Sequence, residues 1–397
     1  MDITKIPQYE LLEHHYVREL ESEGYLMRHK KTGARVFILE NDDNNKVFNI
    51  AFRTVPIDST GVAHIIEHTV LCGSDRYPVK DPFVELVKGS LNTFLNAITY
   101  PEKTIYPVAS CNDTDFQNLM SVYMDAVFHP NIYKYEEIFK QEGWHYELES
   151  EDAPITYNGV VYNEMKGAFS SPEGVLDRVV LNTLFPDTSY ANESGGDPEV
   201  IPELTYEQFL DFHRRYYHPS NSYIYLYGNM DMEEKLAFLD EHYLSHFDYL
   251  DVDSVIQEQK AFGACRDVTL EYPVAENEGE EDNTYLSYNM VVGNAADSQM
   301  AMAFEVLDYA LLSAPGAPLK QALLDVKAGK DVYGSYDDGI LQPYFTVIAK
   351  GSNPDRKEEF VSVIRQVLGD IVKNGIDRKA VELSLIHISE PTRLGMI

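Results

Sequence analysis

The five residues His64-Ile65-Ile66-Glu67-His68 constrain this chain more than any other segment. On an α-helix, side chains four positions apart lie one turn apart on the same face, so the imidazoles of His64 and His68 can reach one metal ion. Glu67 lies beside them, near enough to act on a water bound to that metal. This order of residues is the inverted zinc-hydrolase motif H-x-x-E-H. It predicts a helix that presents two metal ligands and a carboxylate base.

The flanks of the motif also favour a helix. Ser59 and Thr60 are candidate N-caps, the run 61–71 lacks proline, and Gly73 follows as a stop signal. Paired histidines on a helix can also be ordinary hydrogen-bonded residues, and a hydrolytic zinc site needs a third protein ligand.

Cys72, four residues after His68, is one candidate for that ligand. Three ligands in one helical row would bind zinc with poor geometry, and the thiol can equally be a small apolar group at a helix end. A carboxylate on another helix is the better candidate, but spacing alone does not choose among so many acidic residues.

Composition excludes several classes of function. The net charge of −33 disfavours a nucleic-acid partner, whose phosphates would be repelled. The same charge either steers cationic peptides toward the protein or simply keeps it soluble. No stretch approaches the roughly 20 apolar residues needed to span a membrane, and the polar start does not resemble a signal peptide. Three scattered cysteines suit a reducing compartment, so we expect a cytoplasmic protein without a membrane partner.

Two groups of helices and strands are predicted on either side of a polar stretch. The first group comprises strands at 35–39, 47–54, 90–98, 104–109 and 223–227, with helices around the motif, after Asn112 or Asp113, from about Val161, at 205–217 and after Asp231. The second comprises strands at 285–292, 331–336 and 342–349, with helices near 298–313 and 355–373. We therefore expect a catalytic domain at 1–247, a linker at 248–262 and a second domain at 263–382.

A series of short segments carries a more specific signal. They are GVAHIIEH at 61–68, LCGS at 71–74, YPVKDPF at 77–83, LNTFLNA at 91–97, QEGW at 141–144, GVVYNEMKGA at 159–168, SGGDP at 194–198, IPEL at 201–204 and YHPSN at 217–221. Together they resemble the pitrilysin/insulinase family of zinc metallopeptidases, and most closely its presequence-protease branch. The resemblance is dense from about residue 15 to 250 and looser beyond.

This resemblance implies the third metal ligand and the chemistry. The ligand would be Glu164, giving one Zn²⁺ per chain on His64, His68 and Glu164. The implied activity is that of a zinc metalloendopeptidase that degrades short unstructured peptides. Glu67 would take a proton from the zinc-bound water and deliver it to the leaving amine. One position departs from the better-known branches, which carry a second carboxylate seven residues before the third ligand. Tyr157 stands there, which agrees with the presequence branch but leaves the groups that orient the histidines unassigned.

Substrate contacts are implied in the same way. The segment 91–97 resembles the edge strand that holds an extended peptide by β-augmentation, with Asn96 as a candidate contact to the peptide backbone. Four apolar residues match positions that line a pocket for a substrate side chain, and ordinary core packing is the alternative for each of them. They are Leu71, Phe83, Val84 and Val87.

The implied fold is α+β, with tandem homologous α/β units that each pack helices on a mainly antiparallel sheet. Together these units make one half of a clamshell. In the family, a C-terminal half closes the chamber and supplies an arginine and a tyrosine near the scissile carbonyl, so we expect that half as a partner. The alternative is a catalytically silent scaffold half with a binding function. Residues 383–397 resemble the translation of a sequencing adapter, and we expect them to be a non-native tail.

Overall fold

A computed structural model describes residues 3–272, 274, 279–379 and 381–382. These residues form two compact units. Unit 1 lies within Met1–Ser171 and Ser189–Gln257, and unit 2 lies within Pro172–Thr188 and Glu258–Ile397. Both units combine helices with largely antiparallel sheets, which is the predicted α+β class. The adapter-like tail at 383–397 lies outside the described residues.

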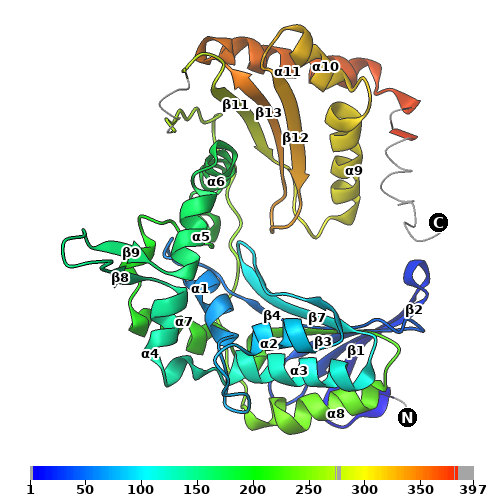
Figure 1. Ribbon diagram of the computed structural model, residues 1–397. Helices are drawn as coiled ribbons and strands as arrows, with labels where there is room; N and C mark the ends of the chain where they lie inside the picture. The colour runs from blue at the N-terminus through cyan, green and yellow to red at the C-terminus, as the bar shows by residue number, and fades with distance from the viewer. Residues whose placement is uncertain (1–2, 273, 275–278, 380, 383–397) are drawn as a thin grey trace. The chain divides into compact units, whose positions relative to one another are not determined.

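One eight-stranded sheet forms the frame of unit 1 (Figure 1). The strand order is β1–β2–β3–β10–β4–β7–β5, β6 also pairs with β7, and β3 and β10 run parallel while the other pairs are antiparallel. The strands are β1 (Tyr9–Val17), β2 (Ser22–His29), β3 (Arg35–Glu40), β4 (Lys46–Arg53), β5 (Asn92–Leu95), β6 (Ile98–Thr99), β7 (Lys103–Ser110) and β10 (Ser222–Gly228). Because β5 ends this order, one of its edges has no partner strand among the described residues.

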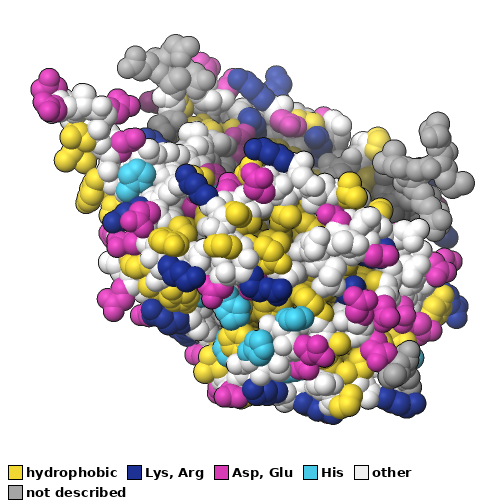
Figure 2. All heavy atoms as spheres, turned by 60° about the horizontal axis from the view of Figure 1, so that its bottom comes forward, with side chains coloured by type: hydrophobic (Ala, Val, Ile, Leu, Met, Phe, Trp, Pro, Cys, Tyr) yellow, Lys and Arg dark blue, Asp and Glu magenta, His cyan; other side chains and the backbone are white. Residues whose placement is uncertain are grey.

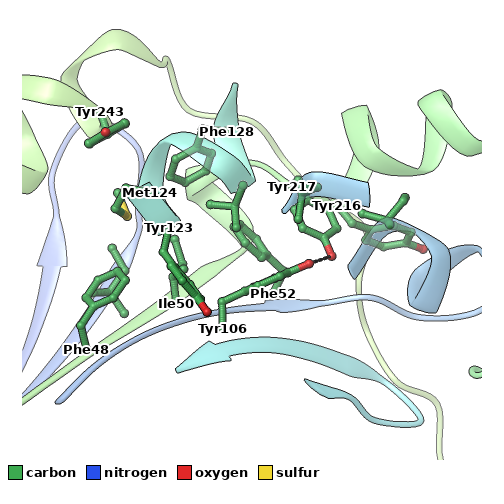
Figure 3. Close-up of a cluster of buried hydrophobic side chains, with 14 of the residues drawn as sticks. Phe48, Ile50, Phe52, Tyr106, Tyr123, Met124, Phe128, Tyr216, Tyr217 and Tyr243 are labelled. Atoms are coloured by element: carbon green, nitrogen blue, oxygen red, sulfur yellow. Dashed lines mark hydrogen bonds between the residues drawn. The ribbon is translucent and has the colours of Figure 1, made fainter. Parts of the chain in front are cut away.

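Helices cover one face of this sheet, as the alternation along β4 requires. Phe48, Ile50 and Phe52 are fully buried, whereas the residues between them are half-buried. The buried face packs with α3 and α8 into an aromatic core, in which Phe52 stacks on Tyr217 with ring centroids 4.6 Å apart (Figures 1 and 3). The helices of unit 1 are α1 (Val62–Val70), α2 (Pro82–Gly89), α3 (Asp113–Phe128), α4 (Glu136–Glu142), α5 (Val160–Ala168), α7 (Tyr206–Tyr216) and α8 (Met232–His242).

Helix α1 begins differently from the sequence prediction. Its N-cap is Gly61, with a left-handed φ of 69°, and neither Ser59 nor Thr60 caps it. The hydroxyl of Thr60 instead donates to the carboxylate of Asp58. A glycine is required at 61 because an added Cβ would lie 2.7 Å from the carbonyl oxygen of Gly195. The start of the motif helix is therefore set by a close approach to a distant loop.

The strand expected at 90–98 is also divided. It forms β5 and β6, with Asn96 and Ala97 between them, and the pairing of β5 with β7 is irregular between Asn92 and Phe94. A separate two-stranded sheet, β8 (His145–Glu147) with β9 (Thr156–Asn158), connects α4 to α5. The edge of unit 1 thus ends in short strands rather than in one long one.

Unit 2 is a smaller layered structure of the same kind. Its three strands run antiparallel in the order β11–β13–β12, and its apolar core includes Leu312, Phe345 and Phe360. A π-helical turn, Tyr309–Ser313, continues α9. The elements are α6 (Pro172–Leu184), β11 (Thr284–Val291), α9 (Ser298–Asp308), α10 (Pro318–Asp325), β12 (Asp331–Asp337), β13 (Tyr344–Ser352) and α11 (Lys357–Asn374).

The two units divide between Gln257 and Glu258, which lies inside the linker predicted at 248–262. Residues 248–262 contain no helix or strand. Helix α6 belongs to unit 2, although the sequence placed it in the first domain. The reason lies in its side-chain contacts, since Glu173 accepts a hydrogen bond from Tyr285 on β11 and pairs with Lys350 on β13. The boundary therefore follows tertiary contacts that local sequence patterns do not encode.

The surface and the cysteines bear on the compositional argument. Acidic side chains are spread over the face displayed in Figure 2 and alternate there with lysine and arginine. All three cysteines are free thiols. Among the described helices, none has the length and apolar character that crossing a bilayer requires.

Candidate metal centre

Helix α1 buries the motif against the core of unit 1. His64 and Glu67 are 8% and 7% exposed, and most of the remaining α1 residues are buried. The imidazole rings of His64 and His68 meet edge to face, with centroids 4.9 Å apart. The one-turn spacing thus gives two rings side by side, as the motif predicts.

Glu164 from α5 reaches both histidines. Its Oε2 atom lies 3.8 Å from Nε2 of His64 and 3.7 Å from Nε2 of His68. One ligand atom from each of these residues lies within 4.8 Å of the other two, and within the described ranges this is the one such group of three or more His, Cys, Asp or Glu residues. The structure therefore brings together the three residues proposed as ligands.

The donor set fits a zinc ion. Ligand atoms on tetrahedral zinc, with bonds of about 2.0–2.1 Å, lie about 3.3 Å apart, so Oε2 of Glu164 needs to approach each histidine nitrogen by only about half an ångström. The side chains of His64 and His68 are 11% and 25% exposed, whereas that of Glu164 is 55% exposed. The group is thus buried on the histidine side and open on the carboxylate side, where a water or a substrate carbonyl can enter.

The other nitrogen of each imidazole also has an acceptor. Nδ1 of His64 lies 3.0 Å from the carbonyl oxygen of Gly195, and Nδ1 of His68 lies 3.4 Å from Oε2 of Glu142. An Nδ1–H that donates to these oxygens leaves the Nε2 lone pair free to bind a metal. In their neutral form, both rings therefore favour the tautomer that a metal site needs.

The charges around His68 shift its pKa in the metal-free protein. Burial alone would lower the pKa of His68, but the hydrogen bond to Glu142 and the charges of Glu67, Glu142 and Glu164 outweigh it and raise the pKa. Burial would raise the pKa of Glu142, and the hydrogen bonds from His68 and Gln141 lower it instead. The two shifts agree and describe one mutually stabilised pair.

Three buried tyrosines lie close enough to Glu67 to be affected by its charge. Burial raises the pKa of Tyr106, Tyr123 and Tyr217, and the nearby charge of Glu67 adds to each shift. The hydroxyls of Tyr106 and Tyr217 share a 2.7 Å hydrogen bond (Figure 3). These phenols remain neutral at ordinary pH, so Glu67 has no competing acid or base among them.

Cys72 is not one of the converging ligands. Its thiol lies 3.5 Å from the main-chain oxygen of His68. Burial, together with the charge of Glu142, raises the pKa of this thiol, which keeps it protonated and a poor metal ligand.

The residues proposed to contact substrate lie in three places: after α1, on α2, and between β5 and β6. Leu71 follows α1 and packs against the unit 1 core, as the core-packing alternative requires. On α2, Phe83 and Val84 are half-buried and Val87 is 55% exposed, and it is Leu86 that packs against the core. Asn96 is exposed in the bend between β5 and β6, and β6 packs against α1.

Sequence reasoning did not find Glu142 and Gly195, the two acceptors for the histidines. Both lie in segments that carried the resemblance, QEGW and SGGDP, but no spacing rule assigned them a role. The position where a second carboxylate was sought holds Tyr157, whose ring packs against Trp144, Tyr146 and Tyr162.

Comparisons with known proteins identify the family that the chain resembles. Residues 53–170, which contain all the residues of the centre except Gly195, match the family described as Insulinase (Peptidase family M16). Residues 203–385 match the Peptidase M16 inactive domain. The chain is 51% identical over 387 residues to Protein HypA of Clostridium perfringens, covering 98% of this chain and 40% of that protein. It is 43% identical to Presequence protease 1, chloroplastic/mitochondrial, of Arabidopsis thaliana, covering 95% of this chain and 35% of that protein.

Solved structures show the same fold. Pitrilysin aligns with a TM-score of 0.63 at 18% identity, over 94% of this chain and 39% of that one. A putative M16-like peptidase from Alicyclobacillus acidocaldarius aligns with a TM-score of 0.62 at 17% identity, over 92% and 83%. The chain spans about two fifths of the length of the curated relatives it matches.

Proposed function

The chain belongs to the insulinase family of peptidases, Peptidase family M16, within its presequence-protease branch, and on this premise we propose that it is the metal-binding part of a zinc-dependent endopeptidase. The observation that carries the proposal is the convergence of His64, His68 and Glu164 beside the buried carboxylate of Glu67. A scaffold without catalytic function needs no base next to its ligands, which favours an enzyme over the silent alternative.

His64, His68 and Glu164 would hold the ion. When bound, zinc supplies a Lewis acid that makes water more acidic and polarises the scissile carbonyl. Glu67 takes a proton from the attacking water and later delivers it to the nitrogen of the leaving amine. Its position one residue before His68 on a buried helix keeps it beside the reacting atoms without making it a ligand.

We further propose that peptides bind at the open edge of β5. Its free edge offers main-chain hydrogen-bonding groups to an extended chain, which is the geometry of β-augmentation. Leu91 and Phe94 are 66% and 49% exposed there. The side-chain Oδ1 of Asn96 accepts from the main-chain N–H of Ala97, which leaves its exposed side-chain NH2 group to donate to a peptide backbone. A peptide must be unfolded to add itself to such an edge, which favours short unstructured substrates.

The substrate class can be tested on the full-length protein. It should cut a disordered peptide of tens of residues and leave a stable globular domain intact. Loss of peptide cleavage after removal of zinc with a chelator, and recovery when zinc is added back, would tie the activity to the metal. Efficient nicking of the folded domain would contradict binding at a strand edge.

This chain by itself should cleave poorly. The family resemblance assigns a closing half, with an arginine and a tyrosine near the scissile carbonyl, to sequence that this chain does not match. Without these donors the developing oxyanion loses preorganised stabilisation. The test is to assay the 397-residue chain alone and with the C-terminal half of a close relative added in trans. Strong zinc-dependent cleavage by the chain alone would mean that its catalytic groups are complete.

A further inference from the structure

We infer that Glu142 is a positioning residue that holds His68 in its metal-binding orientation and tautomer. The inference rests on the proposed function, because it concerns the same three ligands. Both nitrogens of His68 face a carboxylate: Nε2 lies 3.7 Å from Oε2 of Glu164, and Nδ1 is within hydrogen-bonding distance of Oε2 of Glu142, at 3.4 Å. His64 shares the first contact but uses the main-chain oxygen of Gly195 for the second. The two ligands are therefore supported by different chemistry.

The surroundings of Glu142 favour a specific role over a structural one. It is only 8% exposed, and among the described residues it forms no ion pair with a lysine or arginine. A buried carboxylate without such a partner is costly unless hydrogen bonds satisfy it. Its Oε1 accepts a 2.8 Å hydrogen bond from Gln141, which leaves Oε2 directed to His68.

Close packing of α4 against α1 and α5 places the carboxylate of Glu142 beside His68. Glu142 is the last residue of α4, which packs against both α1 and α5. At the next position, Gly143, an added Cβ would lie 3.1 Å from a methyl of Ile65 on α1. At Gly159, immediately before α5, it would lie 2.2 Å from the carbonyl oxygen of Gly143. The two glycines thus permit the close approach of the helices that carry Glu142, His68 and Glu164.

This contact supplies the orienting group that Tyr157 cannot. Tyr157 lies on β9 with its side chain packed among other aromatic rings. The carboxylate comes instead from Glu142 on α4, which precedes the β8–β9 pair in the chain, whereas α5 with Glu164 follows it. A carboxylate that accepts from Nδ1–H strengthens the Nε2 donor and fixes the ring plane.

The experiment measures zinc affinity of the full chain by competition with a chelator, using zinc alone. We expect Glu142→Ala to weaken binding about 10- to 100-fold, as losses of such outer contacts typically do. Glu142→Gln should weaken it less, because its carbonyl oxygen can still accept from Nδ1–H. Glu137→Gln changes an exposed carboxylate on the same helix and should match the wild type. Far-ultraviolet circular dichroism checks folding, and the Gln variant decides the question where the Ala variant does not fold.

A second readout separates positioning from general stability. In the zinc-free chain, at a pH high enough to leave the imidazole of His68 neutral, its ring ¹⁵N chemical shifts, assigned with His68→Gln, should show an unprotonated Nε2 that Glu142→Ala converts to mixed tautomers. Wild-type affinity and tautomer in a folded Glu142→Ala variant would overturn the inference. A wild-type chain that does not bind zinc would instead overturn the proposed function, while the tautomer measurement would still test the contact with Glu142.

Discussion

The two units use the same layers but carry different chemistry. Each packs helices on a largely antiparallel sheet, yet eleven of the twelve histidines of the chain occur before Glu258 and the twelfth, His387, lies outside the described residues. The ligand group found among the described residues belongs entirely to unit 1. The comparison shows that the layered architecture is a scaffold, and that function depends on which side chains one helix presents.

Unit 2 uses its charged groups to hold itself together. Hydrogen bonds from Lys350 and Tyr285 lower the pKa of Glu173 to about 2 and tie α6 to the sheet. In unit 1, by contrast, the carboxylates of three acidic residues surround the imidazole of His68, and they outweigh the effect of burial and raise its pKa. The contacts of Glu173 therefore join elements of unit 2, whereas the carboxylates of the candidate centre gather around one proposed metal ligand.

The largest expected effect is the loss of peptide cleavage when a carboxylate of unit 1, rather than one of unit 2, is replaced. Glu67→Gln in the full-length protein should retain zinc but lose peptide cleavage by about three or more orders of magnitude, because the base is removed and the ligands remain. Glu173→Gln in unit 2 is the matched control and should leave the cleavage rate unchanged. Steady-state kinetics with zinc analysis of both variants makes the test, and near-normal turnover by Glu67→Gln would contradict the mechanism.

A second prediction concerns acid stability of unit 1. Burial lowers the pKa of His213 to about 3, and its ring accepts from Tyr133 and donates to the main-chain oxygen of Val127. The unfolded chain therefore binds a proton that the folded one does not. The free energy of unfolding should fall as pH drops below about 6.5, by about 2 kcal/mol between pH 7 and pH 5 from this group.

Trp144, the single tryptophan, lies in unit 1, so its fluorescence during urea unfolding reports this unit. His213→Gln should lose stability at pH 8 but show a shallower decline between pH 7 and pH 5. His246→Gln, which changes an exposed histidine, should keep the wild-type decline. If the free energy of unfolding declined equally between pH 7 and pH 5 in all three proteins, His213 would not be the cause of the decline.

The smallest effect has the opposite sign and lies in unit 2. Oδ1 of Asp308 is buried without a hydrogen-bond partner among the described residues, and burial raises the pKa of this carboxyl to about 6. The folded state therefore keeps a proton that the unfolded state releases, and stability falls as pH rises from about 4 to 6. Because the side chain is partly exposed, we expect Asp308→Asn to recover only about 1 kcal/mol at pH 8 and nothing at pH 4.

Amide hydrogen exchange of α9 can measure this difference without reporting on unit 1. Asp370→Asn changes an exposed carboxylate in the same unit and should leave the exchange rates unchanged. Slower exchange in Asp308→Asn at both pH values would show that the gain does not come from the charge.

The sequence predicted the parts of the centre that depend on local periodicity. The motif helix, the helix with Glu164 and the capping box of Thr205 and Gln208 all form as expected. The orienting contacts could not be predicted, because they join residues 74 and 131 positions apart through close approaches at glycines. The division of the edge into β5 and β6, and the place of α6 in unit 2, likewise depend on tertiary packing.

Metal content tests the central claim most directly. The purified chain, loaded with zinc and freed of excess ion, should carry close to one zinc per chain because His64, His68 and Glu164 converge on one point. Glu164→Ala should lose most of it, since two histidines alone leave the ion incompletely held. Glu207→Ala, an exposed carboxylate on α7, should retain it. Full zinc content in Glu164→Ala would contradict the assignment and move the third ligand elsewhere.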